Sequence, residues 1–298
     1  MCVPLSFTRR GQGEVTCPAW PAGEVGTCLV IVSSIIMLEG IISGIKEILF
    51  PIGCVDCGVE GEWLCEQCRQ KLKFNSHGAC PVCGILSPLG VPCKNCAAVS
   101  HLNGATALFN YDEQGVVGRL IKLLKYNGAS DTLSVWPKIF SDYTIPSVLT
   151  DATVGPLSFT RACPVLDTGR GQGEVNCLSG TIHIIPVPLH PRRLRERGFN
   201  QATLLVKSFL SAHPQLNWHL DDKNLVRARY TVQQAKLSGT ERRVNLAGAF
   251  AWRGTAPAPE RIIIFDDVYT TGTTAQECAK VLKQSGARTV HALTVARG

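Results

Sequence analysis

The stretch that decides the fold runs from Arg261 to Ala296 and reads RIIIFDDVYTTGTTAQECAKVLKQSGARTVHALTVA. Its first part, RIIIF, has the length and the branched residues of a buried strand, and TVHALTVA has the same character. Between them the sequence predicts a helix over 273–284, with Gly286 as its C′ cap. Strand, helix and strand at this spacing predict a right-handed βαβ unit of a parallel sheet, and therefore an α/β fold.

Two carboxylates and a Thr/Gly loop lie between the first strand and the helix. Asp266 and Asp267 follow the apolar run, and Thr270 to Thr274 lead into the helix. The backbone N–H groups of such a loop bind a phosphate, and Gly272 lets the backbone approach it closely. The lysine of a P-loop is missing, whereas adjacent carboxylates can accept hydrogen bonds from a ribose diol. The loop therefore predicts a ribose 5-phosphate site, the alternative being an ordinary βα loop with two acids.

The cysteines predict metal sites. Eight of the fourteen form four C-x-x-C pairs, and two such pairs supply the four thiolates of a closed, structural zinc site. We therefore predict two structural Zn²⁺ ions and not eight free cysteines, although the spacing does not fix which pairs share an ion. Thiolates kept free for metal imply a reducing compartment, so we expect a cytoplasmic protein. The predicted ligands are Cys54, Cys57, Cys65, Cys68, Cys80, Cys83, Cys93 and Cys96.

The excess of positive charge is local. The formal net charge is +7, and between Pro186 and Arg253 twelve Lys/Arg stand against four Asp/Glu. Such a segment indicates either a surface for an anionic ligand or a solvated charged face.

The amino terminus carries a 14-residue uncharged run over 25–38, which is too short to span a bilayer comfortably and lacks the adjoining basic segment of a signal peptide. We therefore expect no membrane span.

Two short segments, PLSFTR and RGQGEV, occur at 4–15 and again within 156–175. We interpret 1–36 as a repeat-derived extension and 155–177 as a repeat-derived loop insertion. The helix plus double zinc-finger module is expected over 37–100.

The stretch IIIFDDVYTTGTT resembles the phosphoribosyl-pyrophosphate (PRPP) motif of type I phosphoribosyltransferases. The wider chain resembles the ComF family, over about residues 40–298 apart from the insertion. The segments that carry this resemblance are a cysteine-rich finger after LFP, then FNYDEQGVVGRLIKLLKYNG, PVPLHPRRLRERGFNQA and RYTVQQAKLSGTERRVNLAGAF. The resemblance implies a type I phosphoribosyltransferase fold over 101–298, a parallel sheet flanked by helices, preceded by a small Cys-rich zinc-ribbon module.

The resemblance also implies site residues. The two acids would act as catalytic residues that hold the ribose hydroxyls, and the loop after them would hold the 5′-phosphate; together these are Asp266, Asp267, Val268, Thr270, Thr271, Gly272, Thr273 and Thr274. A second loop would bind pyrophosphate with Mg²⁺, and a flexible loop would close over the site. Their residues are Pro188, Leu189, His190, Arg192, Arg227, Arg229, Gln234 and Arg243. Further candidates are Arg193, Arg195, Arg197 and Tyr230, whereas the sequence assigns no role to Lys125.

Two functions follow. A transferase would move the phosphoribosyl group of PRPP to a nitrogen nucleophile, and Mg²⁺ would stabilise the leaving pyrophosphate. Such a transferase would act in DNA uptake or in nucleotide metabolism. Alternatively, a non-catalytic protein that handles single-stranded DNA would use the PRPP site for regulation. The resemblance to ComF implies DNA uptake in natural transformation beside a competence helicase. A zinc module beside a basic segment can contact single-stranded DNA. The sequence identifies neither the acceptor nor the oligomeric state.

Overall fold

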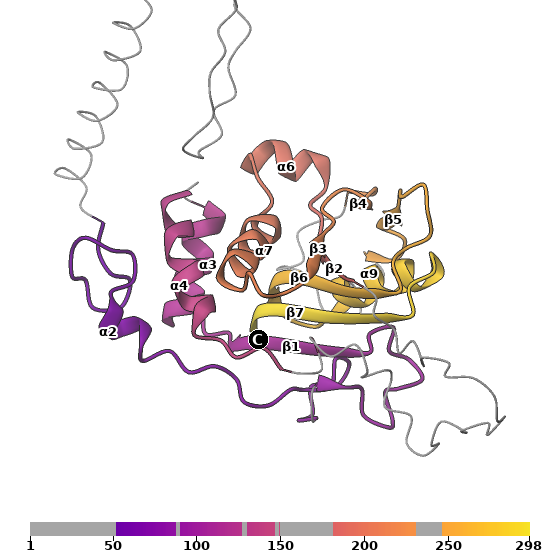
Figure 1. Ribbon diagram of the computed structural model, residues 1–298, viewed down its shortest axis with the longest axis horizontal. Helices are drawn as coiled ribbons and strands as arrows, with labels where there is room; N and C mark the ends of the chain where they lie inside the picture. The colour runs from indigo at the N-terminus through magenta and orange to yellow at the C-terminus, as the bar shows by residue number, and fades with distance from the viewer. Residues whose placement is uncertain (1–51, 88–89, 127–129, 147–148, 150–180, 231–245) are drawn as a thin grey trace, which may run out of the picture. The chain divides into compact units, whose positions relative to one another are not determined.

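The computed structural model describes residues 52–87, 90–126, 130–146, 149, 181–230 and 246–298 (Figure 1). The extension over 1–36, the helix expected before Phe50, the insertion over 155–177 and the loop residues Gln234 and Arg243 lie outside this part of the chain. All elements below belong to one unit that begins at Gly53.

Helices lie between β1 and β2, between β2 and β3, and between β6 and β7, as is typical of an α/β chain. They are α2 (Glu66–Arg69), β1 (Gly104–Asn110), α3 (Val116–Tyr126), the 3-10 helix η2 (Ser130–Ser134), α4 (Val135–Ser141), β2 (Ile182–Pro186), α6 (Pro191–Arg197), α7 (Gln201–Ala212), β3 (Trp218–Leu220), β4 (Leu225–Arg227), β5 (Phe250–Trp252), β6 (Arg261–Tyr269), α9 (Thr273–Gln284) and β7 (Thr289–Arg297).

Five strands form a parallel sheet in the order β1-β7-β6-β2-β3, and β4 and β5 form a separate antiparallel pair. β6 pairs with β7 from Arg261 to Tyr269, whereas β2 pairs with β6 only as far as Phe265. Because every neighbouring pair in the larger sheet is parallel, the carboxyl ends of the strands meet at one edge. The predicted α/β fold is confirmed.

The two faces of the sheet bury two different cores, as alternation along a strand requires. Ile263 and Phe265 of β6 belong to a cluster with the apolar side chains of α3, α4 and α7. Ile262 and Ile264 belong to a second cluster, with the inner face of α9. Figure 1 shows these helices around the strands. The prediction of a parallel sheet flanked by helices is therefore confirmed.

One helix prediction is wrong. The basic and apolar residues from Arg195 through GFNQATLLVKSFL (198–210) predict a single helix that begins near Arg195. The structure instead has two helices, α6 and α7, separated at Gly198, whose φ of 80° is left-handed. Asn200 then caps α7, because its side-chain oxygen accepts the N–H of Ala202 at 3.1 Å. Its amide nitrogen donates to the carbonyl of Val187 at 3.0 Å, which fixes α7 against the end of β2.

Among the described residues, no helix combines the length and apolar composition that a membrane crossing requires.

Candidate functional site: a ligand cavity and two metal ribbons

The edge of β6 that carries the acidic pair faces a cavity and not a strand. The sequence places the end of this strand at Phe265, but β6 continues to Tyr269 together with β7. β2 departs at Pro186: the N–H of Val187 donates to the carbonyl of Phe265 at 2.8 Å, and Pro188, which has no N–H, follows. The last residues of β6 are thereby left without a neighbour on the β2 side.

A cavity of about 400 Å³ occupies this position. Eight of the site residues that the sequence predicts lie in its wall: Pro188, Leu189, Arg227, Asp266, Asp267, Val268, Thr270 and Thr274. The wall also contains Tyr111, Lys125, Val187, Arg193, Arg197, Asn200, Gln201 and Ala202. Carboxylates, a helix N-terminus and several cationic side chains therefore meet in one space of the size that ordinary ligand sites have.

The acidic pair is electrostatically strained. Burial and the adjacent carboxylate of Asp267 raise the pKa of Asp266 well above its ordinary value. Each carboxylate accepts the backbone N–H of the residue that follows it, at 2.9 Å for Asp266 and 2.7 Å for Asp267. These bonds fix the two side chains along the strand. The arrangement offers acceptor oxygens to a ligand with hydroxyl donors.

Lys125 is a site residue that the sequence analysis missed. It lies in the last turn of α3, and its Nζ is 2.7 Å from Oδ2 of Asp267, with side chains 24% and 14% exposed. Burial lowers the pKa of Lys125, but the charges of Asp267 and Asp266 outweigh this and raise it. Lys125 is therefore the charged counter-ion of the acidic pair. The helical spacing of apolar residues from Val116 to Tyr126 predicts an amphipathic helix, which is α3 in the structure. This spacing does not indicate that the carboxyl end of α3 meets β6.

Two arginines of α6 face the cavity. Arg193 and Arg197 line it, and Nη2 of Arg193 is buried without a hydrogen-bond partner among the described residues. The predicted pyrophosphate residue Arg192 is not in the wall: it forms an ion pair with Glu196 at 3.0 Å, and its guanidinium lies 5.0 Å from the ring centroid of Tyr230. The inward face of α6 thus carries positions i and i+4.

The remaining predicted residues of this region have other positions. His190 is the N-cap of α6, because its Nδ1 accepts the N–H of Arg192 at 3.2 Å, and its ring packs edge-on against Tyr230. Tyr230 is 43% exposed. Arg229 donates to the carbonyl of Ala247 at 2.7 Å. None of these three side chains is in the cavity wall.

The Thr/Gly loop leads into α9 as the sequence predicts. Gly272 is the N-cap with a φ of 70°, and a Cβ at this position would overlap the ring and hydroxyl of Tyr269. The hydroxyl oxygens of Thr271 and Thr273 lie 2.9 Å apart. The loop therefore presents backbone N–H groups and hydroxyls at the positive end of a 12-residue helix, where an anion is stabilised.

The cysteines form two clusters, each made of consecutive pairs. In each cluster the four Sγ atoms lie within 4.8 Å of one another, and the clusters are Cys54, Cys57, Cys65 and Cys68, then Cys80, Cys83, Cys93 and Cys96. This settles the pairing that spacing left open. The sulfurs of Cys57 and Cys65 are 3.6 Å apart, and those of Cys83 and Cys93 are 3.7 Å apart. Zn–S bonds of about 2.3 Å in a tetrahedron place sulfurs about 3.8 Å apart, so both donor sets fit Zn²⁺.

Backbone hydrogen bonds prepare the thiolates for metal. The N–H of Cys65 donates to Sγ of Cys54 at 3.5 Å, and that of Cys93 donates to Sγ of Cys80 at 3.4 Å. Burial raises the pKa of Cys54 and of Cys80, but backbone donors outweigh it and lower both to about 6. The two ribbons repeat the same geometry, with Gly58 and Gly84 at φ values of 78° and 79°.

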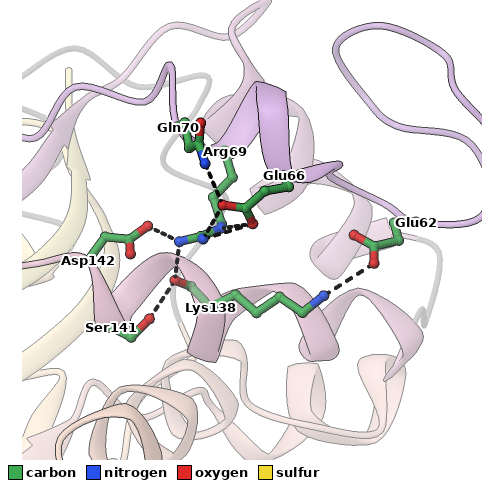
Figure 2. A network of polar contacts seen from close by, with 7 residues as sticks. All are labelled: Glu62, Glu66, Arg69, Gln70, Lys138, Ser141 and Asp142. Carbon is green, nitrogen blue, oxygen red and sulfur yellow. Dashed lines mark hydrogen bonds and ion pairs between the residues drawn. The ribbon is translucent and has the colours of Figure 1, made fainter.

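The first ribbon (residues 53–72) is fixed to α4 through Arg69, as Figure 2 shows. Its guanidinium donates to the carbonyl of Lys138 at 3.1 Å and forms ion pairs with Glu66 and Asp142. Lys138 reaches back to Glu62 at 3.3 Å. The buried residues of this ribbon also join the apolar cluster of α3 and α4. The first ribbon is thus part of the core on that face of the sheet.

Comparisons with known proteins agree with this organisation. Residues 45–97 match the family model of the double zinc ribbon domain. The chain is 33% identical over 239 residues to the DNA utilization protein YhgH of Escherichia coli O157:H7, which covers 78% of this chain and 96% of that protein. It is 38% identical over 121 residues to competence protein F of Haemophilus influenzae (38% of this chain, 49% of that protein). It is 24% identical over 246 residues to competence protein ComFC of Bacillus subtilis (79% of this chain, 85% of that protein).

Proposed function

The chain belongs to the ComF family, with the DNA utilization protein YhgH and the competence proteins F and ComFC, and from this we propose that it binds PRPP with Mg²⁺ and acts in the uptake or use of DNA. The observation that carries the proposal is the cavity in which the acidic pair, the Thr/Gly loop and three arginines meet.

A ligand with two anionic ends and a diol between them matches this wall. Asp266 and Asp267 accept hydrogen bonds from ribose hydroxyls. Thr270 to Thr274, at the N-terminus of α9, hold the 5′-phosphate. Arg193, Arg197 and Arg227 supply the positive charge for pyrophosphate, since guanidinium groups bind phosphoryl oxygens in a bidentate manner. Most of these residues line the cavity of about 400 Å³; the exceptions are Thr271, Gly272 and Thr273.

Carboxylate oxygens are also the ligands that Mg²⁺ prefers, usually one or two together with substrate phosphates. The donor set of Asp266 and Asp267 fits that chemistry. When bound, the ion neutralises charge on the leaving pyrophosphate. The chain's own contribution is to orient the ribose through the acids and to exclude water with Val187, Pro188 and Leu189 in the wall. In the free protein Lys125 forms an ion pair with Asp267, with 2.7 Å between Nζ and Oδ2.

Two versions of this function differ in chemistry. As a transferase, the protein would release pyrophosphate when a nitrogen nucleophile attacks C1 of the ribose. As a non-catalytic component that handles single-stranded DNA, it would use PRPP as a regulatory ligand. The names of the relatives favour a task in DNA use. Arg195 of α6 is exposed and outside the cavity wall, where it can contact phosphates; Arg192 is exposed as well but is paired with Glu196.

Calorimetry tests the proposal directly. The full chain is titrated with PRPP, ribose 5-phosphate and pyrophosphate, each with and without Mg²⁺. We expect PRPP with Mg²⁺ to bind more tightly than either half alone, and Asp266→Asn with Asp267→Asn to abolish this binding without loss of the fold by circular dichroism. Unchanged affinity in the double variant would contradict the assignment of the ribose hydroxyls to the acids.

A second experiment separates the two versions. Nucleobases are screened for PRPP-dependent pyrophosphate release, and a deletion strain is tested for transformation. Turnover with a base supports the transferase. A transformation defect without turnover supports the DNA-handling protein.

A further inference from the structure

The second ribbon (residues 79–100) contacts the carboxyl ends of β6 and β7. The hydroxyl of Tyr269 donates to the carbonyl of Pro81 at 2.6 Å. Arg297 donates to the carbonyls of Ala79 and Cys80 at 3.2 and 2.9 Å. Pro81 lies between the metal ligands Cys80 and Cys83, so these side chains hold the backbone of a metal-binding turn.

The same tyrosine shapes the Thr/Gly loop. Tyr269 is 4% exposed and directly precedes Thr270. Its ring occupies the space beside Gly272 where a Cβ would lie, so loop and ring are in close contact. Arg297 covers the ring, with its guanidinium carbon 4.8 Å from the centroid. The position of Tyr269 therefore determines the path of the loop, and the Pro81 carbonyl fixes the position of Tyr269.

A second contact connects the cysteine pair Cys93 and Cys96 to the first turn of α9, which follows the loop. Gln276 lies in the first turn of α9. Its Oε1 accepts the N–H of His101 at 2.7 Å, and its Nε2 donates to Oγ of Ser100 at 3.2 Å. Ser100 in turn donates its N–H to the carbonyl of the metal ligand Cys96 at 3.0 Å. The pair Cys80 and Cys83 is thus connected to Tyr269, which precedes the loop. The pair Cys93 and Cys96 is connected to Gln276, which follows it.

The first ribbon differs in this respect. Its polar contacts given by the structure lie on α4 and α3: Arg69 with Asp142, Lys138 with Glu62, and Arg119 with Asp56. Its four cysteines form a cluster of the same kind as that of the second ribbon, except that Cys68 is buried whereas Cys96 is only partly buried. The two sites are therefore a matched pair, of which one contacts the loop and the other contacts the helical face.

We propose that metal binding at the second ribbon holds the Thr/Gly loop in its anion-binding shape, with Tyr269 and Gln276 as the positioning residues. Ribbons of this kind fold only when their thiolates hold metal, so metal loss removes the partners of both side chains. A buried tyrosine hydroxyl without an acceptor is unfavourable, and a loop that must be ordered on binding has lower affinity. The proposal rests on the proposed function only for the identity of the ligand.

Hydrogen exchange of the full-length chain tests this without any ligand. The second-site variant is Cys83→Ser with Cys93→Ser, and the matched first-site variant is Cys57→Ser with Cys65→Ser. Elemental analysis of zinc establishes that each variant has lost one ion. We expect amides of residues 270–276 to exchange at least about tenfold faster in the second-site variant alone. Equal exchange in both variants, or no change in the second, overturns the proposal.

Tyr269→Phe removes one hydrogen bond and leaves the ribbon intact. We expect zinc content to stay unchanged, exchange of residues 270–276 to rise, and the affinity for PRPP with Mg²⁺ to fall by about threefold to tenfold, as the loss of one hydrogen bond predicts. Tyr143→Phe, at another buried tyrosine, is the control and should leave both readouts unchanged. Wild-type affinity and exchange in Tyr269→Phe overturn the proposal. If the wild type does not bind PRPP, the proposed function fails, and the exchange experiments still decide the present proposal.

Discussion

At the scale of single residues, the carboxylate of Asp266 makes the folded protein less stable than an uncharged side chain would. Burial and Asp267 raise the pKa of Asp266 above its ordinary value, so the ionised form is disfavoured in the folded state. An acid whose folded pKa is raised contributes stability below its unfolded pKa of about 3.9 and loses it as the pH rises through the folded pKa. Keeping a carboxylate in this position indicates a ligand-binding role.

Asp266→Asn should therefore stabilise the protein at neutral pH. The variant removes the unfavourable charge, so its melting temperature should exceed that of the wild type at pH 7. The difference should shrink as the pH falls and vanish near about pH 3, below the unfolded pKa, where Asp266 is largely protonated in both states. Thermal unfolding followed by circular dichroism between about pH 3 and 8 measures this. A variant that melts lower than the wild type at pH 7 would show that Asp266 is a net stabilising group.

Lys125 has the opposite effect. Its pKa is raised by the acids, so its contribution to stability is present at neutral pH and disappears only above its ordinary pKa of about 10.4. Lys125→Met should lower the free energy of unfolding by about 1–2 kcal/mol, between the values for exposed and buried pairs. Urea unfolding of Lys125→Met, of Asp267→Asn and of the double variant measures the coupling. Additive losses would show that the ion pair contributes nothing.

The sequence predicts the acids but not their counter-ion, for a physical reason. Asp266, Asp267 and the loop are adjacent in the chain, so their chemistry can be read from one stretch. Lys125 reaches them only because α3 packs on the sheet with its carboxyl end at the same edge. That depends on long-range packing, for which helical spacing carries no signal.

At the scale of elements, the face of α6 on which an arginine lies determines whether that arginine lines the cavity. The sequence offers Arg192, Arg193, Arg195 and Arg197 as candidates, and the helix turns Arg193 and Arg197 toward the cavity. The sequence does not distinguish among them for the same reason that it misses the break at Gly198: a run of basic residues does not indicate where its helix begins or ends. The longer β6 is a similar case, since pairing with β7 extends the strand through two aspartates that local propensity would exclude.

Matched pairs of α6 variants test this assignment. Arg193→Ala with Arg197→Ala should weaken pyrophosphate binding at least about tenfold, because hydrogen bonds to charged groups are about twice as strong as neutral ones. Arg192→Ala with Arg195→Ala removes equal charge from the other face and should change it less than about twofold. Calorimetry at fixed salt measures both. Equal losses would indicate a general effect of charge and no facial preference.

At the scale of the whole molecule, two metal ions are expected for each chain. Both four-cysteine clusters fit Zn²⁺, and the double zinc ribbon match spans both. Elemental analysis of purified protein should give close to two zinc ions per chain. Removal by chelation should expose apolar surface, since the first ribbon belongs to the core cluster of α3 and α4. A content of one ion or none would refute the paired sites.

The α/β class follows from local stretches, because one βαβ unit defines the direction of the sheet and one cysteine pattern defines the ribbons. What the ribbons touch does not follow from their spacing. The contacts of Arg69, Tyr269 and Arg297 join residues far apart in sequence, and only the folded chain reveals them.

The strand order has a consequence for biosynthesis. β7 lies between β1 and β6 in the sheet but is translated after both of them. Until Thr289–Arg297 leaves the ribosome, β1 therefore has no strand partner and β6 has one unpaired edge. Unpaired edges invite association with other chains. Arg297 arrives at the same moment and contacts the second ribbon, which is translated much earlier. The metal can thus be loaded before β7 joins β1 to β6 and completes the five-stranded sheet.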